Sequence, residues 1–341
     1  MKMTRHILLA FAAVIAVACT KHSPDGPEPV VPDPLNSYIF FEAGLLDVAQ
    51  TKANLITSLP TTGEYTAFGV IGYYEDGGAI FNHSSYTNNI AKVYRTSNGV
   101  YKYDHLAPWM GTIHTFHAFC PYDMLMSNVK VGTDKIPYIE YTQPTSESGM
   151  RDILGVFKTV TNTGHPVSTV EMQFQHLLWA FELSITNSQT LEVRPDGTTI
   201  ENPSITITKV TLQLADFPAT ANLYLNEGYT SQPLTTSTIS PSYTISSTSQ
   251  VIAKGETKVY GPLLFIPVPN LKYKIIIEYT TAGGAVDQMT YPATGYKTAA
   301  GPFNRATRYS LSIIKTNYKF FEVKDFKPEN WTEENVDHTF N

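Results

Sequence analysis

The sequence predicts an all-β protein made of two tandem antiparallel β-sandwich domains. Short runs of alternating apolar and polar residues, rich in aromatic and β-branched side chains, recur after residue 36. Gly, Pro, Asn and Asp residues typical of turns separate these runs. No segment sustains the periodicity of an amphipathic helix, and 341 residues are enough for two domains of ordinary size.

Residues 1–18 have the composition of a secretory signal peptide. Lys2 and Arg5 make the start basic, and an unbroken run of twelve apolar residues extends from Ile7 to Ala18. A transmembrane helix needs about 20 such residues, so this run is too short to span a bilayer. A cleaved export signal fits better.

A cysteine follows the apolar run at once. The sequence Ala16-Val17-Ala18-Cys19 resembles the lipobox of bacterial lipoproteins, although leucine is usual where Ala16 stands. In lipoproteins this cysteine is acylated and becomes the new N-terminus. We therefore expect lipidation of Cys19 and anchoring in the outer membrane, because several acyl chains bind a bilayer firmly. The alternative is ordinary cleavage after Ala18 and a soluble secreted product.

Residues 19–36 are predicted to form a linker. Their five prolines favour extended polyproline geometry and suppress both helix formation and strand pairing. Such a segment acts as a semi-rigid spacer between a lipid anchor and a folded body.

Residues 37–190 are predicted to form the first sandwich. Asn98-Gly99 lies between two alternating runs and is a strong hairpin signal. Residues 168–187 are long enough for a helix, but their apolar positions alternate before and after Leu177-Leu178, which favours two strands or one bent strand. The other expected strands lie within residues 66–75, 92–104, 112–123, 137–144 and 152–160.

The second sandwich is expected at residues 203–320. The polar stretch 187–202, with a turn at Pro195-Asp196-Gly197, separates it from the first. Residues 321–341 form a C-terminal tail that begins with strand-like alternation. The expected strands of this domain lie within residues 205–217, 219–226, 261–268, 272–281, 288–293 and 308–315.

Composition and motifs argue against several functions. A net charge of −6 gives no reason to expect a nucleic-acid partner. The only other cysteine, Cys120, is interpreted as a small buried side chain, and no internal disulfide is expected. The sequence lacks the HExxH, CxxC, GxSxG, P-loop and dinucleotide-binding motifs, so we expect no enzyme, cofactor or metal site.

His114 and His117 are the pair that most suggests a metal site. Their spacing in a strand sends the two side chains to opposite faces, so they cannot share a metal ion. We expect one histidine to face the core or to be capped, and the other to face solvent.

Several segments follow one another in a characteristic order. They are YIFFEAG at 38–44, TKA at 51–53, TAFGVIGYY at 66–74, Trp109, FHAFCPYD at 116–123, FQHLLWAFELSI at 174–185, FNRATRYSLSI at 303–313 and NWT at 330–332. In this order they resemble the fimbrillin family of Bacteroidales type V pili, in its Mfa-like branch. The match departs from the family at FHAFCPYD, where F-x-A-Y-x-P is usual, and near Ala306, where the family has glycine.

This resemblance implies two transthyretin-like β-sandwiches and no enzymatic activity. In the family, a lipoprotein precursor loses its anchor together with the first strand of domain one, and a strand from the next subunit fills the vacated groove. A sandwich without one strand exposes apolar side chains and an unpaired ladder, and an incoming extended segment satisfies both. The implied partners are other pilin subunits, the outer membrane before processing, and ligands on host or bacterial surfaces.

The resemblance also assigns the processing segment. The strand to be removed would run from Ser37 to about Ala43, with an extension toward Gln50, and its apolar residues are Ile39, Phe40 and Phe41. Cleavage would fall between Lys52 and Ala53. Lysine stands where the family usually has arginine, which suits a trypsin-like protease but not a strictly arginine-specific one. The alternative is that residues 51–53 are a plain surface loop.

The C-terminal tail is the candidate donor strand. Its bulky side chains are Phe320, Phe321, Val323 and Phe326, within an otherwise charged segment. We expect this tail to fill the groove that residues 38–44 vacate in another subunit, which favours a stalk or tip subunit over a base anchor.

Two other classes share some of these features. A surface glycan-binding lipoprotein would have the same anchor, linker and sandwiches, with aromatic side chains exposed on one face. A glycoside hydrolase would need two carboxylates at a suitable separation. Only a pilin would be found in filaments sheared from the cell surface.

Overall fold

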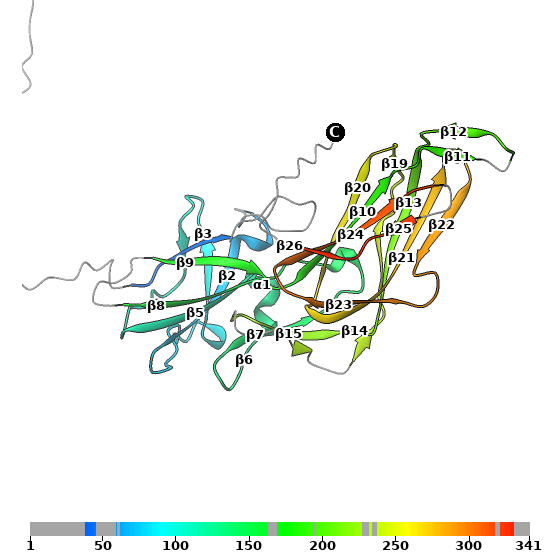
Figure 1. Cartoon of the computed structure of the whole chain (residues 1–341). Helices are drawn as coiled ribbons and strands as arrows, with labels where there is room; N and C mark the ends of the chain where they lie inside the picture. The colour runs from blue at the N-terminus through cyan, green and yellow to red at the C-terminus, as the bar shows by residue number, and fades with distance from the viewer. Residues whose placement is uncertain are drawn as a thin grey trace, which may run out of the picture. The chain divides into compact units, whose positions relative to one another are not determined.

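A computed structural model of the chain describes residues 38–45, 59, 62–162, 169–193, 196–226, 232–233, 237–317 and 321–330. Almost all regular structure in these ranges is β, which confirms the predicted class (Figure 1). The one α-helix in the described part of the chain, α1 (Tyr122–Leu125), has four residues. Single 3₁₀ turns occur at Glu64–Thr66, Thr87–Asn89, Met126–Asn128 and Glu147–Gly149. Across these ranges, no helix is long and apolar enough to span a membrane.

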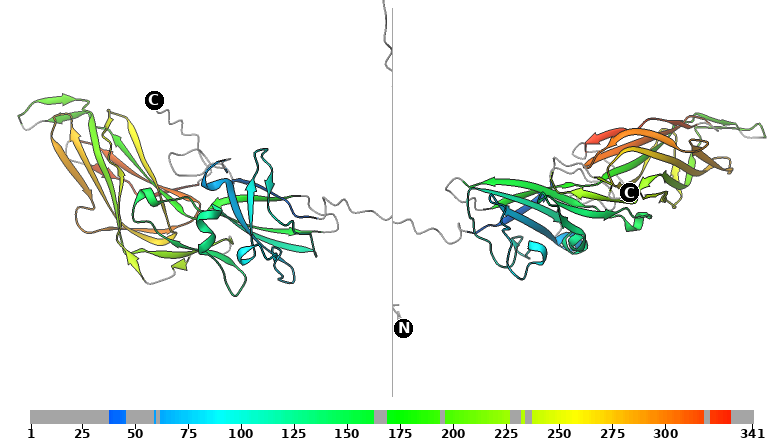
Figure 2. Two further views of the ribbon diagram at one scale, coloured as in Figure 1. Left: turned by 180° about the vertical axis from the view of Figure 1, so that it is seen from behind. Right: turned by 90° about the horizontal axis from the view of Figure 1, so that it is seen from below.

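The first part of the chain forms a seven-stranded sheet. Segments far apart in sequence lie side by side in it, as the mixture of blue, cyan and green strands shows (Figures 1 and 2). In spatial order the strands are β1 (Phe41–Leu45), β9 (Val170–His176), β8 (Leu154–Thr161), β5 (Ile113–Cys120), β2 (Ala67–Tyr74), β3 (Ile90–Arg95) and β4 (Tyr101–Lys102).

The later part of the chain supplies most of the remaining sheets. One sheet contains β20 (Thr257–Phe265), β10 (Trp179–Asn187), β24 (Thr307–Lys315), β25 (Phe321–Val323) and β26 (Lys327–Asn330). The sheet facing it contains β18 (Ser242–Ser246), β13 (Ile205–Ala215), β21 (Val268–Thr281), β22 (Val286–Tyr291), β19 (Gln250–Ile252) and β23 (Lys297–Phe303).

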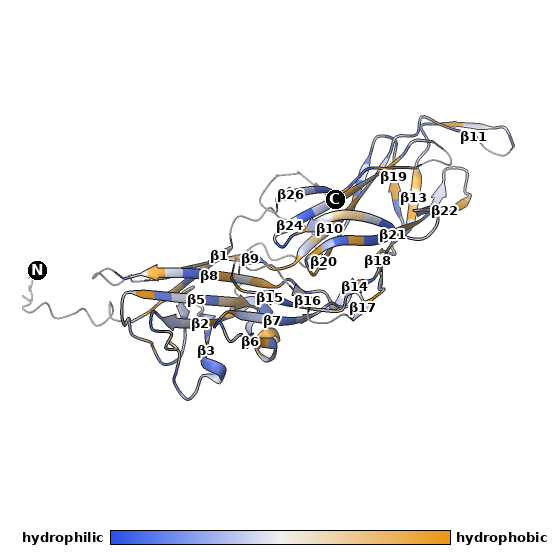
Figure 3. Cartoon of the chain, turned by 60° about the horizontal axis from the view of Figure 1, so that its bottom comes forward, coloured by the Kyte–Doolittle hydropathy of each residue, from blue (hydrophilic) through white to orange (hydrophobic). Residues whose placement is uncertain are grey.

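Smaller sheets complete the fold. A four-stranded one joins both parts of the chain, with β6 (Val129–Val131), β7 (Pro137–Thr142), β15 (Thr220–Tyr224) and β16 (Gln232–Pro233). Two ribbons pair β11 (Leu191–Val193) with β12 (Thr199–Glu201), and β14 (Phe217–Pro218) with β17 (Thr238–Ile239). The strands show alternating hydrophobic and hydrophilic bands (Figure 3), the pattern from which the sequence predicted them.

Strand pairing bears on where the first domain ends. Residues 168–187 contain two strands, as predicted, and only Leu177 and Leu178 separate β9 from β10. β10 then pairs with β20 and β24. Residues 34–341 group into one compact unit, so the expected division between 190 and 203 stays a prediction. From the pairing we propose that the change of sheet at Leu177–Leu178 is the better boundary.

Two strand pairs among the described residues are parallel, which the expectation of antiparallel sandwiches did not include. β1 runs parallel to β9, and β10 runs parallel to β24. Parallel neighbours need a long crossover connection. Here each crossover contains several other strands, so local alternation could not reveal the direction of pairing.

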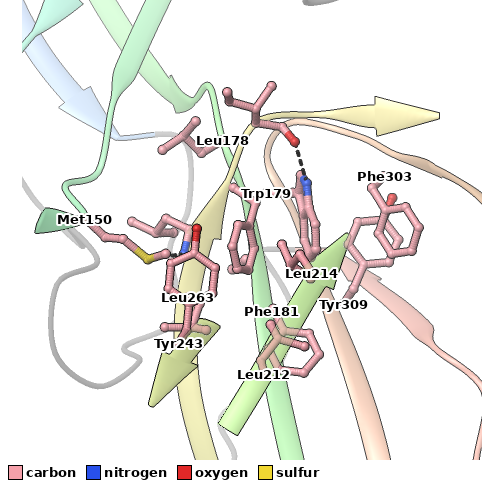
Figure 4. Packing of buried hydrophobic residues seen from close by; sticks show 14 of the residues in the cluster. Met150, Leu178, Trp179, Phe181, Leu212, Leu214, Tyr243, Leu263, Phe303 and Tyr309 are labelled. Carbon is pink, nitrogen blue, oxygen red and sulfur yellow. Dashed lines mark hydrogen bonds between the residues drawn. The ribbon is translucent and has the colours of Figure 1, made fainter. Parts of the chain in front are cut away.

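Trp179 anchors the core of the second part. Its side chain is fully buried, and the indole Nε1 donates a hydrogen bond to the backbone oxygen of Ile266 at 2.8 Å (Figure 4). The rings of Phe265 and Phe303 lie 4.9 Å from it, and that of Tyr309 lies 5.6 Å away. Trp179 thus buries a large apolar area in close contact with other aromatic rings, and its N–H has the hydrogen-bond partner that a buried indole needs.

Two glycines of β2 allow large side chains to pack on both faces of the first sheet. A Cβ on Gly69 would lie 2.2 Å from the Phe119 ring, and a Cβ on Gly72 would lie 2.9 Å from Ile80. Phe119 belongs to the core on one face of the sheet and Ile80 to the core on the other. The two glycines of the Phe68-Gly69-Val70-Ile71-Gly72 segment are therefore explained by packing.

The two histidines of β5 lie on opposite faces, as their spacing predicts, but the expectation that one faces solvent is wrong. His114 and His117 are both buried. The backbone N–H of Met110 donates to His114 Nε2 at 3.3 Å, and Phe157 covers His117 with ring centroids 4.9 Å apart. Cys120 is fully buried, as predicted, and burial raises the pKa of its thiol.

Replacing Gly69 by alanine tests the packing of β2. Gly69→Ala should lower the free energy of unfolding by about 1–3 kcal/mol, because the Phe119 ring must move. Gly44→Ala is the matched control, since its added Cβ meets only the flexible Gln173 side chain at 3.2 Å. Chemical denaturation measures both variants, and equal effects would contradict this account.

Candidate assembly site

Part of the predicted site lies outside the described residues. Cys19, Lys52, Ala53 and Phe320 are in this group. The described part comprises the first strand, residues 38–45, and the tail, residues 321–330.

The first strand is an edge strand with a single ladder partner. Residues Phe41–Leu45 pair in parallel with Val170–Phe174 of β9, and no strand covers their other side in the described sheet. At its start, the N–H of Ile39 donates to the oxygen of Ala107 at 2.9 Å. The hydroxyl of Tyr103 donates to the oxygen of Ile39 at 2.6 Å. Removing this segment would therefore break one edge of the sheet and leave its centre intact.

The inward side chains of the first strand are nevertheless core residues. Ile39 and Phe41 are buried, whereas Phe40 is only partly buried, in keeping with the alternation of a strand. The Phe41 ring centroid lies 5.6 Å from the ring centroids of Tyr103 and Phe116. It lies 6.2–6.4 Å from those of Phe81 and Phe68. Without the first strand, this aromatic cluster would line an open groove.

The tail is also an edge segment with one ladder partner. β25 and β26 both pair antiparallel with β24 of the same chain. The tail thus completes its own sheet in this structure.

Phe326 and Phe321 hold the tail in place. The Phe326 ring lies 5.1 Å from Tyr273, 5.4 Å from Phe303 and 5.8 Å from Phe181. Phe321 packs at 5.2 Å against Tyr279. These bulky side chains are the ones that the alternation of the tail identified, with Val323 packing against the same core.

Charged side chains fix β26 to β24. Both Nε and Nη2 of Arg308 donate to Glu329 Oε2, at 3.0 and 2.7 Å, and Ser310 donates to Glu329 Oε1 at 2.9 Å. Glu182 lies 3.7 Å from Arg308, and burial raises the pKa of its carboxyl although Arg308 lowers it. Charge-assisted bonds of this kind are about twice as strong as neutral ones.

Lys315 is a member of this region that sequence reasoning did not identify. Its side chain is fully buried, and its ammonium lies 4.4 Å above the Phe321 ring and 4.8 Å above the Tyr279 ring. Nζ also donates to the oxygen of Asn317 at 2.9 Å. Burial lowers the pKa of Lys315 to about 8, although Asp287 and Glu192 raise it. A lysine at the end of an alternating strand gives no sequence signal of burial.

The structure does not bring the two candidate segments together. The first strand belongs to the seven-stranded sheet, and the tail belongs to the sheet of β24. Within one chain they therefore do not compete for the same ladder. Within the described ranges, no group of three or more His, Cys, Asp or Glu residues is arranged to hold a metal ion.

The first strand and the tail are thus edge segments of two different sheets of a layered β fold. The sequence signature of the fimbrillin-like family matches residues 51–331, so the chain belongs to that family. A search of characterised protein sequences finds no match.

Two solved structures show the same fold. A fimbrial protein from Bacteroides vulgatus is 17% identical with a TM-score of 0.53, over 87% of this chain and 100% of its own. A candidate cell adhesion protein from Bacteroides ovatus is 15% identical with a TM-score of 0.51, over 87% of this chain and 99% of its own.

The buried ammonium should make stability depend on pH in a defined direction. Because its pKa is about 8 in the folded state and 10.5 is its ordinary value, the unfolded chain binds more protons between these values, so stability rises with pH there. Relative to Lys315→Met, the wild type should gain up to roughly 3 kcal/mol of unfolding free energy across this window.

Urea denaturation of both proteins between pH 7 and 10.5 measures this difference. Both proteins carry the same tyrosines, so tyrosine ionisation largely cancels. A difference that is constant across the window would show that Lys315 keeps its ordinary pKa.

Proposed function

We propose that this protein is a structural subunit of a fimbria, exported as a lipoprotein and assembled by strand exchange between subunits. The observation that carries the proposal is the first strand, which is an edge strand with core side chains and a single ladder partner. Membership of the fimbrillin-like family supports the subunit role and gives no support to an enzymatic one.

The physical basis of exchange is the combination of main-chain and side-chain interactions. The vacated edge of β9 would offer unpaired N–H and C=O groups beside the aromatic cluster around Phe41. An extended segment with bulky side chains on alternate positions would satisfy both. Each fully buried side chain of this type contributes about 1.5–3 kcal/mol.

We propose the tail as the donor segment. Because the tail is paired with its own chain in the monomer, it has to be released before it can enter a neighbour. Phe326 and Glu329 first have to leave their partners on the same chain. Exchange is then favourable only if the contacts formed in the neighbour replace those lost. The monomer would keep its tail folded back until a groove with complementary pockets is available, which limits premature association.

We propose that lipidation at Cys19 delivers the subunit to the outer membrane, and that cleavage between Lys52 and Ala53 opens the groove. Its partners are then other pilin subunits, with the outer membrane as a partner before processing and host or bacterial surface ligands afterwards. A stalk or tip position fits a subunit that has both a groove and a donor segment.

Introduced cysteines test the exchange. Glu171 lies on β9 beside the first strand, Glu322 lies in β25, and both are exposed. In filaments of the processed protein, Glu171→Cys combined with Glu322→Cys should join neighbouring subunits through a short bis-maleimide. The control pair, Glu171→Cys with Asn98→Cys in a hairpin turn, should not.

Gel electrophoresis of the sheared filaments gives the readout. A ladder of covalent multimers is expected for the first pair alone. Filaments that form normally but crosslink only within single chains would exclude exchange through this tail.

Lipidation has a separate test. Cys19→Ser should abolish labelling by a fatty-acid probe and leave unprocessed precursor or a soluble periplasmic form, because the acylated thiol is absent. Labelling in cells, followed by fractionation, measures this outcome. If the serine variant is still labelled and reaches the surface, the lipoprotein interpretation is wrong.

A further inference from the structure

A cavity of 340 Å³ lies on the face of the seven-stranded sheet opposite the buried Phe41 side chain. On this face, core residues of β6, β7 and α1 cover Ile71 and Phe119. The core does not extend to the first half of β5, where Ile113 and Thr115 lie. The cavity occupies the uncovered end. It is lined by residues of β2, β5 and β8, among them Tyr73, Thr115, His117 and Phe157, and by the turn between β6 and β7.

The floor of the cavity is a strip of three rings from adjacent strands. His117 pairs across the sheet with Phe157, and their ring centroids are 4.9 Å apart. The Tyr73 ring lies 6.4 Å from His117 on the other side. Tyr73 and Phe157 are only partly buried, so their rings are open to a ligand. Flat aromatic surfaces of this kind suit the C–H faces of a sugar ring.

His117 supplies polar chemistry at the centre of the floor. Its side chain is 4% exposed, and its Nδ1 has no hydrogen-bond partner among the described residues. A buried polar atom without a partner is costly unless something binds to it. Burial lowers the pKa of His117 to about 4, so the ring is neutral at physiological pH. A neutral imidazole carries one donor and one acceptor, which matches a hydroxyl group.

The rim carries charges of both signs, and its one ammonium is already engaged. Lys135 Nζ donates to the backbone oxygen of Gly77 at 2.8 Å and so links the β6–β7 turn to the end of β2. Glu75 and Asp134 are acidic. Around this cavity two carboxylates face one paired cation, so an anionic ligand gains no net attraction here.

A second cavity shares Tyr73 with the first as a lining residue. It has a volume of 500 Å³ and is lined by Tyr73, Ile90, Asn88 and Asn89 and by β6, which contributes one cation, Lys130. Lys130 Nζ donates to the backbone oxygen of Ser127 at 3.5 Å, so this ammonium is also engaged. Both asparagines have positive φ angles, 54° and 58°, in a single 3₁₀ turn. Their amide side chains offer donors and acceptors next to the tyrosine ring.

We propose that this pair of cavities binds a neutral saccharide, with one sugar ring over the Tyr73–His117–Phe157 floor and the next unit beyond Tyr73. A volume of 340 Å³ is near the lower end for small-molecule sites, about 300–1,000 Å³, and fits one or two sugar rings. The inference goes beyond the proposed subunit role. It concerns the monomer, so its failure can be told apart from a failure of strand exchange.

Saturation-transfer NMR on the purified protein tests this site. The probes are mannose, galactose, N-acetylglucosamine and lactose, with N-acetylneuraminic acid and glucose 6-phosphate as anionic counterparts. At least one neutral sugar should show transfer, and the anionic sugars should not. Tyr73→Ala and Phe157→Ala should each weaken binding about tenfold, as expected for the loss of one stacking surface.

Further variants separate recognition from folding. His117→Phe keeps the ring shape, removes both nitrogens and should abolish binding while the melting temperature is retained. Thr115→Tyr should block the cavity without removing a floor ring. Tyr94→Ala, an exposed tyrosine on β3 that lines neither cavity, should bind like the wild type. Absence of transfer for all four neutral sugars, equal binding of the anionic sugars, or unchanged binding in folded His117→Phe and Thr115→Tyr would overturn the proposal.

Discussion

The burial of Trp179 at the start of β10 is the constraint on which much of the molecule depends. Its indole donates a hydrogen bond to the oxygen of Ile266 and packs against Phe265 of the neighbouring strand β20 and Phe303 of the facing sheet. Gln143, from the first part of the chain, holds the same segment, because its side-chain amide donates to the oxygen of Leu264 and accepts from the N–H of Ile266, both at 3.0 Å. β9, which belongs to the seven-stranded sheet, ends at His176, and only Leu177 and Leu178 separate it from Trp179. This core therefore sets the position of β10, and β10 in turn sets the position of β24, to which the tail pairs.

The two proposed assembly segments share one physical property, which is attachment to a single neighbouring strand. Among the described strands, β1 pairs only with β9, and β25 and β26 pair only with β24. One isolated bridge, between Tyr38 and Pro108, precedes β1. A segment of this kind can leave without disturbing the centre of a sheet, since every other ladder stays intact. Its bulky side chains make departure unfavourable in an isolated monomer. In the proposed exchange the tail would give up its contacts with β24 and form new ones in the groove of a neighbouring subunit.

The proposed saccharide site lies on strands that do not take part in this exchange. β2, β5 and β8 are central in the seven-stranded sheet, and they carry Tyr73, His117 and Phe157 on the face away from Phe41. Loss of the first strand would leave the floor of the cavity in place. Adhesion and assembly could then act in one subunit through opposite faces of one sheet.

The sequence by itself determined the class of fold, most strand positions, the strand rather than helix character of residues 168–187 and the burial of Cys120. These follow from local alternation and turn residues, which act over a few positions. The sequence named Ile39, Phe40 and Phe41 as core candidates, and of these Ile39 and Phe41 are buried and Phe40 is partly buried. It named the bulky side chains of the tail as donors to another subunit, whereas Phe321, Val323 and Phe326 pack here against the core of their own chain. Only the tertiary structure decided the parallel pairing of β1 with β9, the pairing of the tail with its own β24, and the burial of His117 and Lys315. Each of these depends on which distant strand lies alongside, and a period of two along one strand carries no information about its neighbour.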